Sequence, residues 1–215
     1  MNGKLASFMV MVLSAIMLAA CASTGQAPRS LEGKYVGAGT GTCLFAVCGF
    51  GDYNVPQAPV GPTGGWGSGA WSLSNNNHSV VMELKPDGTG TVSEDMYNVV
   101  LNNTTRTIPW PSTGEMKTTY QITYTVESDG TFTLKDVPGA FKSEVVSGAM
   151  KGLSFVLKGF SNVGHVSPDG NVVTMFDTGT PHTFMPPMYT CPAPIEPKPE
   201  AAWVCNEEFT LFKQR

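Results

Sequence analysis

The feature that most constrains this chain is an Asp-Gly pair that recurs between strand-like runs, in ELKPDGTGTV, TVESDGTFTL and HVSPDGNVVTM. Asp-Gly readily supplies the positive φ angles that a tight β-hairpin turn needs. The flanking residues alternate between apolar and polar, as they do in a strand with one buried face. The sequence therefore predicts three hairpins, over residues 79–100, 117–137 and 152–178.

Two more strands are expected at the ends of the folded domain, in GKYVGAGTGTC near its start and NEEFTLFKQR at its end. With the hairpins they give about eight strands in simple succession, and pairing the last strand with the first removes both edges of such a sheet. We therefore predict an all-β fold, an antiparallel up-and-down barrel, with a two-sheet β-sandwich as the alternative. The best helical pattern lies at 138–152, where Phe141, Val145 and Ala149 recur at a spacing near four.

This number and order of strands resembles the lipocalin and calycin class of barrels, although GKY at 33–35 stands where that class has Gly-x-Trp. A barrel of eight strands is just wide enough either to be filled by its own side chains or to hold one small ligand. In the same strand, Gly37, Gly39 and Gly41 occupy alternate positions and leave one face without side chains. These glycines predict a bend or a close approach of another element. The space beneath the strand then serves either the curvature that closure needs or a ligand.

The first 20 residues have the features of a secretory signal peptide. Lys4 precedes an uncharged run over 5–20, which is shorter than the ~20 apolar residues of a membrane span. The run ends in LAAC at 18–21, which resembles the lipobox of bacterial lipoproteins. The resemblance implies cleavage before Cys21 and attachment of acyl chains such as palmitate, so that lipid anchors the protein. Ala22 after the cysteine favours the outer membrane, with the protein facing the periplasm or exposed at the cell surface.

The chain therefore divides into a signal peptide over 1–20, a lipidated flexible tether over 21–30 and a β-barrel domain over 31–215. The signal peptide is expected to be helical. Its removal deletes one of 13 basic residues and none of 17 acidic ones, which leaves a formal charge of −5. Nucleic acid is therefore not expected as a partner. The histidines and carboxylates fit no known catalytic motif, so we expect neither an enzyme nor a cofactor.

With Cys21 lipidated, four cysteines remain, an even number that fits an oxidising compartment. We predict that Cys43, Cys48, Cys191 and Cys205 form disulfides. Proximity in the sequence favours Cys43 with Cys48 and Cys191 with Cys205. A metal site is the alternative, but neither pair has the CxxC spacing of a zinc knuckle.

Aromatic residues indicate where a ligand would bind. Trp66, Trp71 and Trp110 lie in or beside long connections rich in glycine and proline, where they could line the mouth of a barrel. Tyr120 and Tyr124 lie on the apolar face of a predicted strand. The favoured hypothesis is an outer-membrane-anchored lipoprotein that binds or carries a small apolar ligand in the cell envelope.

Two other functions remain open. In HTFMPPM, His182, Met185 and Met188 are spaced three residues apart and offer an imidazole and two thioethers, which are soft ligands suited to Cu(I). The proline-rich tract MPPMYTCPAPIEPKPEAAWVC is stiff and extended, as a docking loop for an envelope protein would be. A protein-interaction or inhibitor module is therefore the other alternative.

Overall fold

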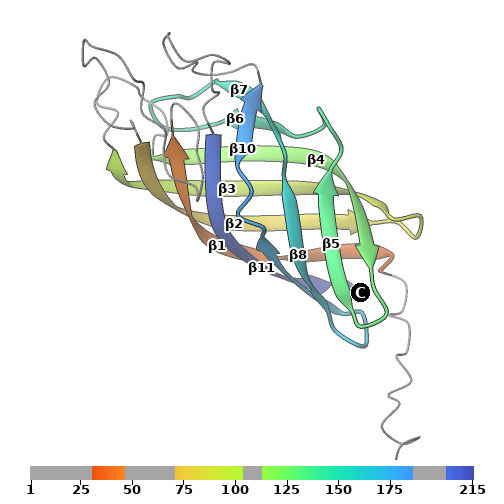
Figure 1. Ribbon diagram of the computed structural model, residues 1–215. Helices are drawn as coiled ribbons and strands as arrows, with labels where there is room; N and C mark the ends of the chain where they lie inside the picture. Colours follow the sequence, from red (N-terminus) through yellow and green to blue (C-terminus); the bar gives the residue numbers. More distant parts are fainter. Residues whose placement is uncertain (1–30, 47–70, 104–112, 186–201) are drawn as a thin grey trace, which may run out of the picture.

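The computed structural model of the chain describes residues 31–46, 71–103, 113–185 and 202–215 (Figure 1). These residues form eleven β-strands and no helix, so none of them belongs to a helix able to cross a membrane. The predicted signal helix, Cys21 and the tether lie outside the described residues. The strands are β1 Gly33–Ala46, β2 Trp71–Leu84, β3 Thr89–Asn103, β4 Gly114–Val126, β5 Thr131–Asp136, β6 Lys142–Val145, β7 Ser154–Lys158, β8 Ser161–Val166, β9 Val172–Asp177, β10 His182–Met185 and β11 Ala202–Lys213.

Eight of the strands close into an antiparallel barrel. They are hydrogen-bonded in the order β1-β2-β3-β4-β5-β8-β9-β11, and β11 returns to β1 along a register that runs from Tyr35↔Lys213 to Ala46↔Ala202. The predicted closed barrel is confirmed, and the alternative of a two-sheet sandwich is not what the chain forms.

The remaining strands β6, β7 and β10 lie outside this ring but form a second connection between β4 and β11. β6 pairs with β4, β7 with β6, β10 with β7, and β11 with β10. Along the chain, β5 leads into β6, β7 into β8, and β9 into β10. If β5 and β6, β7 and β8, and β9 and β10 are each counted as one long strand with a break, the barrel consists of eight long strands in chain order. The three predicted hairpins are confirmed, with turns at 85–88, 127–130 and 167–171.

Each of the three breaks contains a glycine with positive φ. These are Gly139 at 79°, Gly159 at 88° and Gly179 at 69°, a backbone conformation that other residues rarely adopt. The first break lies in the segment predicted to be helical, and that prediction is wrong. Phe141 and Val145 are buried together with Ser143 between them, which is the two-residue period of strand β6. A spacing of four fits both periods, so it could not distinguish them.

The barrel has two different ends (Figure 1). The three Asp-Gly turns and the start of β1 lie at one end, named here the hairpin end. β1, β3 and β10 finish at the opposite end, where β2, β4 and β11 begin; this is named the loop end. Segments 47–70, 104–112 and 186–201 connect strands at the loop end.

The interior differs between the two ends. The half nearest the hairpin end is filled with apolar side chains, and the half nearest the loop end also contains buried polar and charged side chains. The hairpin half includes Tyr35, Val80, Met82, Val92, Ile122, Phe132, Leu134, Val173 and Leu211, all no more than 2% exposed.

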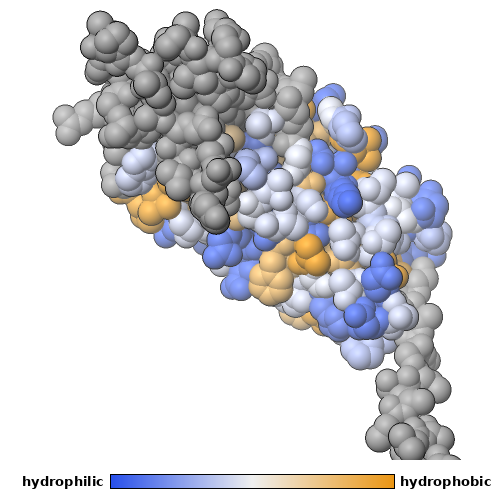
Figure 2. Space-filling model, in the orientation of Figure 1, coloured by the Kyte–Doolittle hydropathy of each residue, from blue (hydrophilic) through white to orange (hydrophobic). Residues whose placement is uncertain are grey.

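The side of the barrel seen in Figure 2 is largely polar, with an apolar patch over β8 and β9. There Val163 and Phe176 are paired directly across the two strands and are 40% and 51% exposed. Elsewhere the alternation read from the sequence holds. Tyr120 and Ile122 point inward, whereas Gln121 and Thr123 are exposed.

Candidate functional site

The site begins with the glycines of β1 and the residues that face them on β11. Gly39 pairs with Phe209 and Gly41 with Glu207. A Cβ atom on Gly39 would lie 2.3 Å from Cδ1 of Phe209, and one on Gly41 would lie 2.3 Å from Cγ of Glu207. Gly39 and Gly41 therefore make room for side chains of the neighbouring strand and Gly37 for its backbone, so this space is not available to a ligand.

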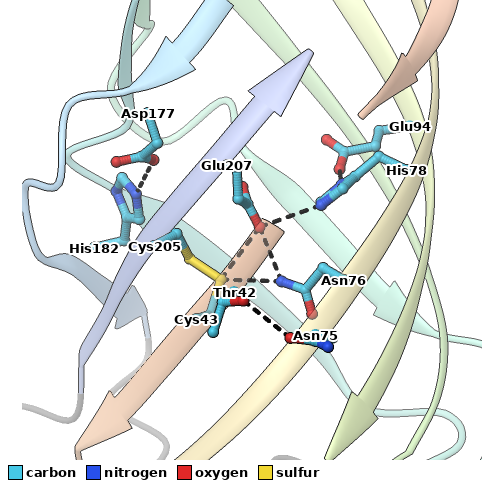
Figure 3. Close-up of polar contacts among 10 residues, drawn as sticks. All are labelled: Thr42, Cys43, Asn75, Asn76, His78, Glu94, Asp177, His182, Cys205 and Glu207. Atoms are coloured by element: carbon cyan, nitrogen blue, oxygen red, sulfur yellow. Dashed lines mark hydrogen bonds and ion pairs between the residues drawn. A yellow bond between two sulfur atoms is a disulfide. The ribbon is translucent and has the colours of Figure 1, made fainter. Parts of the chain in front are cut away.

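Glu207 on β11 contacts residues of β2 and β3 in a network named here the polar cluster: Asn76, His78, Glu94 and Glu207 (Figure 3). Asn76, His78 and Glu207 are buried, and Glu94 is largely buried. Asn76 Nδ2 donates a hydrogen bond to Glu207 Oε1 at 2.8 Å. His78 Nε2 lies 3.2 Å from the same oxygen, and His78 Nδ1 is paired with Glu94 Oε1. The imidazole is therefore held between two carboxylates, with the edge of its ring against Phe209 at a centroid distance of 5.1 Å.

The electrostatics of the polar cluster favour an ion pair. Burial alone would lower the pKa of His78, but the charge of Glu94 and the hydrogen bonds to Glu207 and Glu94 outweigh it and raise that pKa to about 10. Burial would raise the pKa of Glu207, but the hydrogen bond to His78 and its charge lower it below the ordinary value. At neutral pH the cluster is thus a buried imidazolium with two neighbouring carboxyl groups.

A disulfide borders the polar cluster. Cys43 and Cys205 face each other in register on β1 and β11, and their sulfurs are bonded. Asn76 Nδ2 donates to Cys43 Sγ at 2.9 Å, and the same sulfur lies 3.2 Å from Glu207 Oε1. The predicted local pairings of Cys43 with Cys48 and Cys191 with Cys205 are wrong, because closure of the barrel brings distant strands together. Cys48 and Cys191 lie outside the described residues.

His182, predicted as a copper ligand, lies buried on β10 with both ring nitrogens occupied. Nε2 is 2.8 Å from Asp177 Oδ2, and Nδ1 is 3.3 Å from the carbonyl oxygen of Gly159 (Figure 3). The structure thus joins His182 to a carboxylate across the break between β9 and β10. The side chain of Met185 and all of Met188 lie outside the described residues, so the copper site stays a prediction.

The residues predicted to line an apolar ligand site do not come together around a hollow. Tyr120 stacks on Phe141 at 4.5 Å between ring centroids and packs edge-on against Phe160 in the core. Tyr124 lies near the hairpin end, where its hydroxyl donates to the carbonyl oxygen of Lys85. Trp71 begins β2 at the loop end. Trp66 and Trp110 lie outside the described residues.

An internal cavity of about 40 Å³ adjoins the polar cluster. It has room for a few water molecules, whereas ligand pockets usually measure about 300–1,000 Å³. Its lining combines carboxylate, imidazole, amide and hydroxyl groups with aromatic rings. The lining residues include Asn76, His78, Glu94, Thr118, Ser143, His182, Trp203 and Glu207.

Sequence reasoning missed His78, Glu94 and Glu207 as members of one site. A signal was present, because His78 shares the phase of Val80 and Met82, and Glu207 lies between Cys205 and Phe209 at inward positions. Charged residues at inward positions of a barrel strand are costly unless they are paired.

The described geometry therefore offers a buried, charged and largely filled interior, fastened by a disulfide between the first and last strands of the barrel. Comparison of the chain with protein-family models, curated proteins and solved structures finds no match.

Proposed function

We propose that this protein is a lipid-anchored envelope protein that presents the loop end of its barrel to a partner protein. The observation that carries the proposal is the position of the N-terminal side of the domain. β1 begins at the hairpin end, where Gly33 pairs with Leu84 beside the turn 85–88. The long connections 47–70, 104–112 and 186–201 join strands at the opposite end.

This arrangement sets an orientation if Cys21 is lipidated. The tether 21–30 would reach at most about 33–36 Å, and it enters the domain at Leu31, which is buried. The hairpin end would then face the membrane and the loop end would face away. Binding residues are commonly carried by long connections on a rigid scaffold, and a closed barrel supplies such a scaffold.

The filled interior also favours a partner protein over a carried ligand. Apolar side chains pack the hairpin half, and the cavity of about 40 Å³ in the loop half is lined by apolar side chains together with the charged groups of the polar cluster. An apolar molecule placed there would separate a buried ion pair from its partners without replacing their hydrogen bonds. Binding of a small apolar ligand stays a prediction, and the described residues do not favour it.

Site-specific photo-crosslinking in living cells tests the proposal. A photoreactive residue would replace Leu101 or Tyr97, which are 55% and 45% exposed on β3 toward the loop end. Matched probes would replace the exposed Asp87 and Asp129 in turns of the hairpin end. We expect a discrete protein adduct from the loop-end probes alone. Equal adducts from both ends, or none from the loop end, would contradict the proposal.

The anchor is tested separately with Cys21→Ser. We expect the variant to leave the membrane fraction and to lose the loop-end adduct, because partner and protein no longer share a surface. If the variant stays in the membrane fraction, Cys21 does not anchor the chain. If it becomes soluble and keeps the adduct, lipidation is not needed for the encounter.

A further inference from the structure

The buried cysteines lie beside an unusual set of metal-binding groups. Of the three histidines in the chain, His78 and His182 both line the cavity that also contacts Cys43, Cys205 and Glu207. The two sulfurs and a carboxylate oxygen of Glu207 all lie within 4.8 Å of one another. A disulfide needs no buried charge next to it, so the presence of these charges calls for a further explanation.

The distances already approach those of a tetrahedral site. Donor atoms that share a zinc ion lie about 3.3–3.8 Å apart, given zinc bonds of about 2.0–2.3 Å. Cys43 Sγ lies 3.2 Å from Glu207 Oε1, and His78 Nε2 lies 3.2 Å from the same oxygen. The donor atoms of Cys43, Cys205 and Glu207 already lie within 4.8 Å of one another. His78 adjoins this set through Glu207. The two sulfurs are bonded to each other and must separate before they can share a metal ion.

The orientation of His78 is an independent indication. Its Nδ1 is paired with Glu94, which leaves Nε2 on the side of Glu207, 3.2 Å from Oε1 (Figure 3). A histidine that binds a metal through one nitrogen typically donates the other N–H to a carboxylate, which fixes the ring and raises its basicity. Glu94 occupies that position relative to His78.

We propose that reduction of the Cys43–Cys205 disulfide opens a four-donor Zn²⁺ site made of the two thiolates, Glu207 and Nε2 of His78. A carboxylate and an imidazole beside two thiolates suit Zn²⁺ better than Cu(I), which prefers soft ligands throughout. The site is distinct from the predicted copper loop and does not depend on the function proposed above.

The chemistry balances with a dithiol or phosphine as reductant. A dithiol supplies two electrons and two protons and becomes a disulfide. A phosphine supplies the two electrons and becomes a phosphine oxide, with water providing the oxygen and the two protons. In either case the sulfur–sulfur bond breaks and two thiols form. Zn²⁺ then displaces the two thiol protons and the proton on Nε2 of His78. The reduced protein would thus carry a metal ion in place of the covalent link between β1 and β11.

The test uses a chain in which Cys21, Cys48 and Cys191 are replaced by serine, so that Cys43 and Cys205 are the only cysteines. Zn²⁺ binding is measured by competition with a chromophoric chelator, before and after reduction with a phosphine. We expect one Zn²⁺ bound per reduced chain and none by the oxidised chain. X-ray absorption of the reduced complex should show two sulfur ligands and imidazole scattering. Equal binding by both forms, no binding after reduction, or a bound ion without two sulfurs and an imidazole would overturn the proposal.

Variants of single ligands sharpen the result. His78→Gln should abolish stoichiometric binding, and His165→Gln, which changes an exposed histidine on β8, should leave it unchanged. Glu94→Gln should lower the affinity by about 10–100-fold, because it weakens the support of the ligand ring. If His78→Gln does not fold, X-ray absorption of the parent chain decides the matter. Identical affinities in the folded His78→Gln and His165→Gln variants would exclude His78 as a ligand.

Discussion

The two halves of the barrel interior are stabilised by different kinds of interaction. Toward the hairpin end, Tyr35, Met82 and Phe132 are fully buried in an apolar core. Toward the loop end, His78 and Glu207 are also buried, at 6% and 7% exposed, although each carries a charge. One half is held by the hydrophobic effect, which is nearly non-directional. The other depends on a specific set of partners, so its side chains cannot be exchanged one at a time.

This difference indicates which interior positions tolerate substitution. An apolar core tolerates substitutions that conserve volume, whereas a buried ion pair tolerates the loss of neither partner. A domain that needed only to be stable would have no reason to place three ionisable groups in its interior. The polar half is therefore the better candidate for a chemical role, and the hairpin half for a structural one.

The largest losses are expected from single substitutions in the interior, and the first is in the apolar half. Phe132→Ala removes a ring that is 0% exposed and stacks with Tyr124. We expect a loss of about 3–5 kcal/mol in the free energy of unfolding, from lost burial and the cavity left behind. Urea denaturation measures it, with Val163→Ala on the exposed face of β8 as the control, expected within about 0.5 kcal/mol of the parent. A loss below about 1 kcal/mol for Phe132→Ala would mean that this half is not the stabilising core.

The polar half should respond in the opposite way to single and combined changes. His78→Gln leaves Glu94 and Glu207 without their cation and should cost about 3–5 kcal/mol. Replacing the three together, with His78→Leu, Glu94→Leu and Glu207→Met, should restore the stability to the parent value or above it. Denaturation curves of the two variants provide the comparison. If the triple variant is as unstable as His78→Gln, the ionic network is required for folding.

The glycine row of β1 should be sensitive to a single methyl group. Gly41→Ala places a carbon 2.3 Å from Cγ of Glu207 and 2.7 Å from the carbonyl oxygen of Asn206, so we expect a loss of about 1–3 kcal/mol from overpacking. Thr40→Ala changes the adjacent, outward-facing position and should have little effect. Thermal unfolding of both variants measures the difference. Equal melting temperatures would show that β1 and β11 can separate without cost.

The smallest effect, for a change of one pH unit, is a dependence of stability on pH. His78 has a pKa of about 10 in the folded protein against an ordinary value of 6.5, so its contribution is complete below pH 6.5 and is lost as the pH rises through 10. Between pH 7 and 9 the unfolding free energy should fall by up to about 1.4 kcal/mol per pH unit. The triple variant provides the control and should show a flatter profile. Parallel profiles would mean that His78 does not hold its proton in the folded state.

The local part of the fold could be predicted from the sequence, because Asp-Gly turns and two-residue alternation act over a few residues. The barrel closure followed from the need to remove sheet edges. The partner of Cys43 could not be found in this way, because it depends on the register between β1 and β11, which no local pattern encodes.

The polar cluster was missed for the same reason. Asn76 and Glu207 are 131 residues apart, and only the closed barrel brings them to 2.8 Å. The spurious helix at 138–152 arose where a strand is broken, so that its alternation is too short to recognise. The strand alternation could have shown that His78 and Glu207 face inward. It could not show which side chains they contact there.

The pairing of β1 with β11 also determines when the barrel can close during folding. Cys43 and Cys205 are separated by 162 residues, so the barrel stays open until nearly the whole domain is available to fold. Contacts between such distant residues slow folding. Until β1 and β11 pair, the open barrel exposes two unpaired strand edges. If the chain is exported, both edges must be protected during transport. The Cys43–Cys205 disulfide can then form only in the oxidising compartment beyond the membrane.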